Sequence, residues 1–264
     1  MFTIFTIPKA FTDPHISLIQ RNAIKSWKQL TGAKIILIGN DPGVAETAQE
    51  FQVKHLPDVA CNEFGTPLLD SAFALAKKNS DSDILIYANA DIIFLENLAS
   101  SLEKLPLENF LTVGRRIDLD VEKEINFKNA DWGEKIKTAG HLHSVAGIDY
   151  FIFKKNSFAN IPPFAIGRVG WDNWMIYEAH CQKMAIIDAT EDITAIHQNH
   201  SYPTHNDRDR KTNPEAKNNA ALVEDRARYF TIEDANWKLT KGKLIKKRFT
   251  WWPSWKRYSK LKFK

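Results

Sequence analysis

The feature that most constrains the fold is an apolar run from residue 84 to 95, interrupted once by Asn89-Ala90-Asp91. Residues 84–87 are Ile, Leu, Ile and Tyr, a composition typical of a buried strand. A carboxylate at the end of such a strand needs a partner, because an unpaired buried charge is very costly. Since α/β proteins bind ligands at strand ends, Asp91 is a candidate for metal or nucleotide binding. The alternative is that Asp91 only closes a turn, which Asn and Asp favour.

Strand and helix patterns alternate around this run, which predicts an α/β fold with a mostly parallel sheet and helical crossovers. Asp13 is expected to cap the first helix, and Thr66 to cap the helix that leads to the central strand. Residues 118–147 are polar and fit neither pattern. The expected strands are 2–7, 34–38, 53–56, 84–87, 110–113, 150–153, 184–188 and 193–196. The expected helices are 15–30, 44–51, 68–79, 97–105, 171–181 and 215–229.

Length and composition are those of a globular protein. The 264 residues suffice for one large domain or two small ones, and 44% hydrophobic with 26% charged residues is ordinary for a soluble chain. No apolar run reaches the 18 residues that a membrane span needs. The first residues lack the pattern of a signal peptide, and Cys61 and Cys181 are far apart in sequence. These features favour a reducing, cytoplasmic location.

The charge is divided unevenly along the chain. Residues 237–264 contain eleven Lys and Arg and no acidic residue, whereas the remainder carries 25 basic and 32 acidic residues. Aromatic residues are interleaved with the basic ones, which suits an anionic membrane surface. Nucleic-acid binding and packing of the aromatics against the core are the alternatives. We expect a catalytic domain over residues 1–213 and a C-terminal helix with a basic, membrane-associated tail over 214–264.

His197 and His200 are candidate metal ligands. They follow the strand expected at 193–196, so they should lie at a strand end, as Asp91 does. Manganese accepts imidazole beside carboxylate, and both Mn and Mg favour oxygen ligands. With His205 the spacing is H-x2-H-x4-H, which matches no helical zinc motif. Solvated loop histidines are the alternative.

A second candidate segment runs from Arg168 to Trp174. Asp172 is expected in the first turn of a helix, where the helix dipole favours its ionised form. A carboxylate in that position could take a proton from a hydroxyl group. Trp171 and Trp174 could form walls for a sugar ring, or could simply lie in the core beside an ordinary capping Asp. Earlier in the chain, Asn62 and Thr66 belong to a turn-rich loop that is expected to lie near a bound nucleotide.

Together these pieces resemble the GT-A glycosyltransferases over roughly residues 1–205. Asn89-Ala90-Asp91 stands where that family has Asp-x-Asp. Gly170-Trp171-Asp172-Asn173 is similar to its Gly-x-x-Glu-Asp region, and His197 or His200 to its late metal-binding histidine. The chain departs from the family pattern at Asn89, which replaces an acid, and at Asn173, which follows Asp172 where a second acid is expected.

The resemblance implies a GT-A-like Rossmann-type sandwich that holds a divalent metal, Mn or Mg, and transfers a sugar from a nucleoside-diphosphate sugar to an acceptor hydroxyl. It implies that Asp91 binds the metal with His197 or His200, and that Asp172 is the base of an inverting reaction in bacterial surface glycan or glycolipid synthesis. The donor-binding residues it implies are Pro8, Asp41, Asn62, Thr66, Asn89, Asp91, Arg168 and Trp171.

Two other functions are compatible with such a sheet. A sugar-nucleotide nucleotidyltransferase normally has a Gly-rich first loop with an Arg, whereas this loop is Ile7-Pro8-Lys9-Ala10-Phe11. A non-catalytic protein that binds a membrane or RNA through the tail is the third possibility. Nucleic acid is the less favoured partner of the tail.

Overall fold

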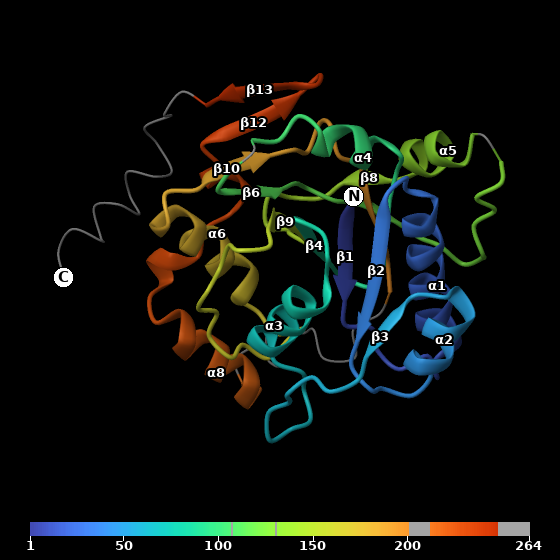
Figure 1. The fold of residues 1–264 in the computed structure, drawn as a ribbon, viewed down its shortest axis with the longest axis horizontal. Helices are drawn as coiled ribbons and strands as arrows, with labels where there is room; N and C mark the ends of the chain where they lie inside the picture. Colours follow the sequence, from blue (N-terminus) through green and yellow to red (C-terminus); the bar gives the residue numbers. More distant parts are fainter. Residues whose placement is uncertain (107, 130, 201–211, 248–264) are drawn as a thin grey trace.

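The computed structural model describes residues 1–106, 108–129, 131–200 and 212–247, and it contains a nine-stranded and a four-stranded sheet (Figure 1). The large sheet has the order β13-β12-β10-β6-β9-β4-β1-β2-β3. Its strands are β1 (Phe2–Thr6), β2 (Ala33–Ile38), β3 (Lys54–Leu56), β4 (Ile84–Ala88), β6 (Phe110–Val113), β9 (Tyr150–Lys154), β10 (Ala185–Asp188), β12 (Trp237–Thr240) and β13 (Lys243–Lys246).

The large sheet is mostly parallel, as the sequence predicts. Strands β9 and β13 run opposite to the others, because β9 pairs antiparallel with both β4 and β6 and β13 pairs antiparallel with β12. The carboxyl ends of β1, β2, β4 and β6 therefore meet at one edge, which is the lower edge of β1 and β2 in Figure 1. The amino end of β9 lies at the same edge. Residues that come directly after one of these parallel strands, or directly before β9, therefore lie at this edge.

Helices cover both faces of the large sheet. One core cluster joins the sheet to α3, α6 and α8, and the other joins it to α1, α2 and α4. Asp13 caps α1 as expected, since its Oδ1 accepts from the Ile16 N–H at 2.8 Å. The helices are α1 (Pro14–Gln29), α2 (Val44–Phe51), α3 (Leu69–Asn79), α4 (Asn97–Leu102), α5 (Trp132–Ala139), α6 (Trp171–Cys181) and α8 (Pro214–Val223), with 3-10 turns at Arg226–Arg228 and Ile232–Asp234.

The segment that shows no sequence pattern, residues 118–147, contributes two of the four strands of the second sheet, β7 and β8. The order of this sheet is β5-β11-β7-β8, with β5 (Ile92–Phe94), β11 (Ala195–Gln198), β7 (Ile117–Leu119) and β8 (His141–Leu142). The strand expected at 193–196 begins at Ala195 and continues to Gln198. The prediction that His197 follows the strand is therefore wrong, because His197 lies within β11 and is paired on both sides.

Other boundaries also differ from the predictions, among them the end of α4, which lies at Leu102 rather than at residue 105. Helix α3 is preceded by Leu68, so Thr66 does not cap it. The Thr66 N–H instead donates to the Asn62 side chain, within a tight loop. Helix α8 ends at Val223 and is followed by short 3-10 turns, whereas a continuous helix to residue 229 is predicted.

The C-terminal part of the described chain joins the large sheet. Strand β12 pairs in parallel with β10, and Leu239 is fully buried. The segment 248–264 lies outside the described residues, and so does His205. The expected domain boundary at residue 213 stays a prediction. Within the described residues, no helix is both long enough and apolar enough to span a membrane, and both cysteines are free and exposed.

Candidate active site

The predicted ligands Asp91, His197 and His200 come together at the carboxyl edge of the sheet. Asp91 Oδ2 lies 3.0 Å from His200 Nε2 and 3.5 Å from His197 Nε2. One ligand atom from each residue falls within 4.8 Å of the others, a spacing that a single metal ion can bridge. The histidine side chains are only 2% and 3% exposed, so they are part of a built site rather than solvated.

The small sheet sets this arrangement. In the pairing of β5 with β11, Ile92 lies opposite His197, so the residue before Ile92 is carried to the histidines. The Asp91 carbonyl accepts hydrogen bonds from both the backbone N–H and the side-chain Nε2 of Gln198, at 3.3 and 3.0 Å. The backbone at Asp91 is thus fixed by β11 itself. The Asp91 carboxylate is therefore positioned by the pairing of two strands that are more than 100 residues apart in sequence.

The Asp91 carboxylate fits a bound cation. Burial raises its pKa, but the hydrogen bond from His200 and the charges of His197, His200 and Lys9 hold it below the ordinary value. Asp91 is therefore ionised at neutral pH. Its Oδ1 is buried and has no hydrogen-bond partner among the described residues. One carboxylate and two imidazoles form a donor set that suits a transition metal such as Mn.

Asn89 links Tyr87 to two residues that the sequence did not single out, Asp149 and Arg116, in a hydrogen-bonded chain beside Asp91. The Tyr87 hydroxyl donates to Asn89 Oδ1 at 3.2 Å, and Asn89 Nδ2 donates to Asp149 Oδ1 at 2.7 Å. Arg116 Nη1 then donates to Asp149 Oδ2 at 2.8 Å. The amide of Asn89 thus holds buried Asp149 in place. Contact between Asn89 and a nucleotide stays a prediction.

Asp172 lies close to this chain. The pKa of the Tyr87 phenol is raised well above its ordinary value, first by burial and then by the charges of Asp91, Asp149 and Asp172. Burial likewise raises the pKa of Asp172 itself to about 6, and the charge of Asp149 adds to the effect. Asp172 Oδ1 is buried and lacks a hydrogen-bond partner among the described residues. A carboxylate with these properties can accept a proton at neutral pH.

The tryptophans beside Asp172 lie in the core. Trp171 and Trp174 are each 5% exposed. The Trp171 ring contacts Tyr87 and Phe151, with ring centroids 5.3 Å apart in both pairs. This packing leaves little indole surface for a sugar ring, so it favours the alternative in which both tryptophans support α6. Contact of Trp171 with a donor stays a prediction.

Asn62, Thr66 and Arg168 come together around a glutamate that the sequence did not single out. Asn62 Nδ2 donates to Glu215 Oε1 at 2.8 Å, and Arg168 Nε and Nη2 donate to Glu215 Oε2 at 2.9 and 2.5 Å. Burial raises the pKa of Glu215, but the hydrogen bonds from Asn62, Thr66 and Arg168 hold it below the ordinary value. The cluster anchors the loop and α8 to each other.

Lys9 places a cation near Asp91. Partial burial lowers the pKa of Lys9, the charge of Asp91 raises it, and the charge of Arg168 lowers it. Lys9 therefore lies within electrostatic range of both residues. Pro8, just before it, is buried at the end of β1, and Asp41 is exposed in the turn after β2. Both lie at the predicted edge, but their contact with a nucleotide base stays a prediction.

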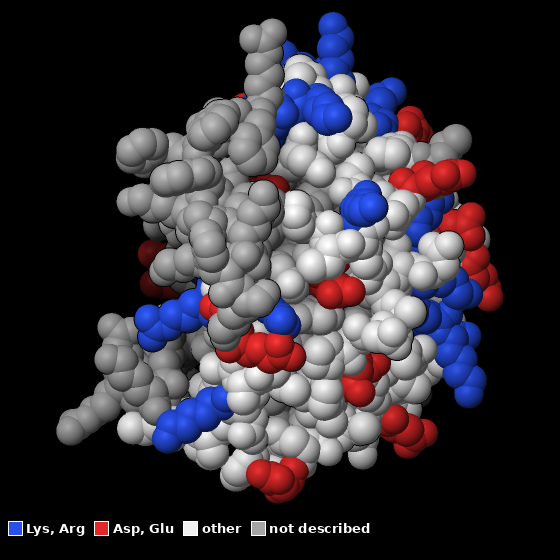
Figure 2. Space-filling model, turned by 90° about the vertical axis from the view of Figure 1, so that its left-hand side faces the viewer, with Lys and Arg blue, Asp and Glu red and all other residues white. Residues whose placement is uncertain are grey.

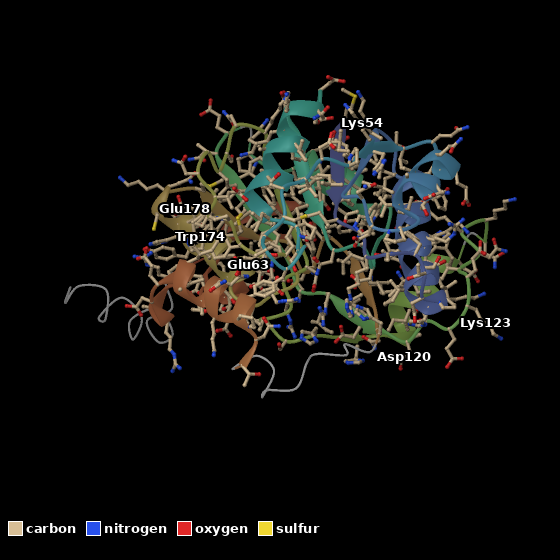
Figure 3. All side chains as sticks on the ribbon, turned by 90° about the horizontal axis from the view of Figure 1, so that it is seen from below. Lys54, Glu63, Asp120, Lys123, Trp174 and Glu178 are labelled. Atoms are coloured by element: carbon tan, nitrogen blue, oxygen red, sulfur yellow. The ribbon has the colours of Figure 1, made fainter. Side chains whose placement is uncertain are left out.

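Figure 3 views this edge from below. Trp174 and Glu178 mark α6 on one side of the molecule, and Asp120 and Lys123 mark the polar segment after β7 on the other side. Glu63, in the loop that contains Asn62, lies between them. The candidate ligands themselves come from two segments that lie more than 100 residues apart in sequence, at Asp91 and at His197 and His200.

No family model matches the sequence, and no curated protein matches it either. The structure is similar to crystal structures of glucosyl-3-phosphoglycerate synthase from Mycobacterium tuberculosis. The complex with Mn²⁺, UDP and glucosyl-3-phosphoglycerate matches with a TM-score of 0.50 at 12% identity, covering 87% of this chain and 80% of that one. The complex with Mn²⁺, UDP and phosphoglyceric acid matches with a TM-score of 0.51 at 13% identity, covering 85% and 78%. At such low identity the similarity concerns the fold, and the fold is the GT-A type that the sequence predicts.

Proposed function

We propose that this protein is a metal-dependent glycosyltransferase that moves a sugar from a nucleoside-diphosphate sugar to an acceptor hydroxyl. The observation that carries the proposal is the cluster of Asp91, His197 and His200 at the carboxyl edge of a GT-A sheet. Ligands of open α/β sheets bind at this edge. The similar synthase was crystallised with UDP and Mn²⁺, which makes these two the first ligands to test.

In this proposal, Asp91, His197 and His200 hold a divalent ion, Mn or Mg. When bound, that ion supplies positive charge that stabilises the departing diphosphate. The charges of Asp91 and Arg168 both act on the pKa of Lys9, so Lys9 lies within electrostatic range of both residues. The cationic groups of Lys9 and Arg168 would bind the remaining phosphate oxygens.

Asp172 is the proposed base. Its carboxylate takes the proton of the acceptor hydroxyl, the acceptor oxygen forms a bond to the anomeric carbon, and the bond from that carbon to the diphosphate oxygen breaks. Attack from the side opposite the diphosphate inverts the anomeric centre. Support comes from the buried, unpartnered Oδ1 of Asp172 and from its pKa of about 6, which keeps it ionised but basic at neutral pH.

We also propose that the acceptor is a glycan or a lipid-linked molecule, met at an anionic membrane surface. The described part of the basic segment supports this idea. In the hairpin of β12 and β13, Ile245 is 50% exposed, and Lys241, Lys243 and Lys246 are exposed around it. Figure 2 shows Lys and Arg side chains at the top of one face, the end at which Figure 1 places the hairpin. An exposed aliphatic side chain among lysines suits an anionic lipid headgroup layer.

Ligand-induced thermal shifts test the metal and donor sites. UDP should raise the melting temperature only when Mn²⁺ is present. Asp91→Ala should abolish that rise, whereas Asp83→Ala, an exposed change before the same strand, should keep it. Asp172→Asn should keep the rise and stop transfer. If no nucleotide shifts the melting temperature with or without Mn²⁺, the non-catalytic alternative is favoured.

Flotation with liposomes tests the membrane proposal. The full chain should float with vesicles that contain phosphatidylserine and remain at the bottom with neutral vesicles. Truncation after Lys247 should reduce flotation, and Ile245→Ser with Lys243→Gln should reduce it further. Unchanged flotation in both variants contradicts a membrane role for this part of the chain.

A further inference from the structure

A buried carboxylate lies behind His197, on the side away from Asp91. Asp118 of β7 is 6% exposed. In the parallel pairing of β11 with β7, Asp118 lies directly opposite His197, so the two side chains project from the same face of the small sheet. His197 Nδ1 is 3.5 Å from Asp118 Oδ1, and His197 Nε2 is 3.5 Å from Asp91 Oδ2. The imidazole of His197 therefore stands between two carboxylates.

Asp118 is itself fixed by other polar groups. Arg116 Nε donates to Asp118 Oδ1 at 2.8 Å, and His143 Nδ1 lies 2.5 Å from Asp118 Oδ2. Through Arg116 the chain continues to Asp149 and from there to Asn89. The contacts with Arg116 and His143 hold the Asp118 carboxylate in place beside His197.

We infer that Asp118 is a positioning residue that orients His197 for metal binding. When Nε2 of a histidine binds a metal, Nδ1 carries the proton, and a carboxylate that accepts this proton fixes the tautomer and the plane of the ring. Asp118 is placed to do this for His197. The inference rests on the metal site of the proposed function and adds to it a residue that would touch neither metal nor substrate.

The described residues offer a second acceptor for Nδ1 of His197. Asn199 Oδ1 lies 3.3 Å from it, slightly closer than the Asp118 carboxylate. The Asn199 side chain also donates to Asp120, and that contact is exposed. A charged acceptor forms the stronger hydrogen bond with an imidazole N–H. Asp118 is also the more deeply buried of the two. We therefore expect Asp118 to contribute more to the orientation of His197 than Asn199 does.

Mn²⁺ affinity, measured from the electron paramagnetic resonance signal of the free ion, tests the inference without any turnover. Asp118→Asn keeps the size of the side chain and removes its charge. We expect it to weaken Mn²⁺ binding by about 10- to 100-fold, the range seen for partners of metal-bound histidines. Asn199→Ala should weaken it less. Asp131→Asn is the control, since that carboxylate is exposed and paired with Lys135, and it should change nothing.

A double-mutant cycle identifies the residue through which Asp118 acts. In a His197→Ala background, Asp118→Asn should have no further effect on Mn²⁺ affinity, because the ring that it orients is gone. In a His200→Ala background, its effect should persist. If Asp118→Asn weakens Mn²⁺ binding equally in both backgrounds, Asp118 acts on the site as a whole and the inference is wrong.

The remaining outcomes separate this inference from the proposed function. Wild-type affinity in Asp118→Asn refutes the positioning role and leaves the metal site intact. A wild-type chain that binds no Mn²⁺ refutes the metal site, and the inference with it. If Asp118→Asn does not fold, His143→Gln replaces it, since that change loosens Asp118 from the opposite side. It should weaken Mn²⁺ binding a few-fold, and unchanged affinity would again refute the role.

Discussion

The proposed base should reduce the stability of the protein that carries it. Burial raises the pKa of Asp172 from an ordinary 3.8 to about 6. Each pKa unit corresponds to about 1.4 kcal/mol, so the ionised form costs the folded state about 3 kcal/mol at pH 8. Asp172→Asn removes the charge and the cost. The uncharged amide is still buried, for which about 1 kcal/mol is subtracted, so the variant should be about 2 kcal/mol more stable at pH 8.

The sign of the effect follows from proton binding. Between pH 3.8 and 6 the folded wild type binds a proton at Asp172 that the unfolded chain has released. Its stability therefore falls as the pH rises through this window, and the penalty is complete above pH 6. At pH 4 only about 0.5 kcal/mol of the penalty remains. The free-energy difference between Asp172→Asn and wild type should therefore change by about 2.5 kcal/mol between pH 4 and pH 8.

Urea unfolding at the two pH values measures this change directly. Glu178→Gln is the matched control, because it removes a carboxylate from the same helix that is only half-buried and accepts from Gln182. It should alter the free energy of unfolding by less than about 0.5 kcal/mol at either pH. A stability difference for Asp172→Asn that is the same at pH 4 and pH 8 would refute the argument that burial holds Asp172 in a strained ionised state.

Three further predictions follow from the same edge. Single-turnover transfer should fall about tenfold per pH unit below pH 6, as Asp172 becomes protonated, and a flat rate between pH 5 and 7 would argue against it as the base. Arg168→Met should lower the free energy of unfolding by about 2 kcal/mol or more in urea titrations, because Glu215 stays buried without its cation; Glu215→Gln with Arg168→Met should recover part of the loss. Asn89→Asp should destabilise the fold by about 2 kcal/mol at pH 8 and less at pH 4, since it places a second carboxylate against Asp149. Equal stability of variant and wild type at pH 8 would contradict the role of Asn89 as a donor to Asp149.

Local sequence patterns predicted the elements in which apolar residues recur at a regular spacing. The strand at 110–113 and the helix at 171–181 match to the residue, because their apolar spacing depends only on neighbours in sequence. Thr66 and Pro67 have the residue types of a helix start, yet the helix begins at Leu69. Asn62 accepts from the Thr66 N–H and Glu215 accepts from the Thr66 side chain. A long-range partner thus overrode a local preference.

The site shows the same division. Asp91, His197 and His200 are recognisable in sequence because each lies in or beside an apolar strand and bears a metal-binding group. Asp118 and its neighbours carry no such signal, since they sit in a polar segment with no periodicity. Their place depends on the register of β7 against β11, a pairing between segments about 80 residues apart. The direction of β9, which brings Asp149 to the edge, is likewise a property of the whole sheet.

The charge balance of the edge explains why Asn89 need not be an acid. Four carboxylates already gather there, those of Asp91, Asp118, Asp149 and Asp172. Arg116 bridges Asp118 and Asp149, and Asp91 is paired with the histidines. No cation of the described residues forms an ion pair with Asp172. A carboxylate at position 89 would face Asp149 at hydrogen-bonding distance, and its repulsion would have to be offset by the same arginine. An amide at that position instead donates to Asp149, so the negative charge available to a metal is concentrated on Asp91 and the two imidazoles complete the donor set.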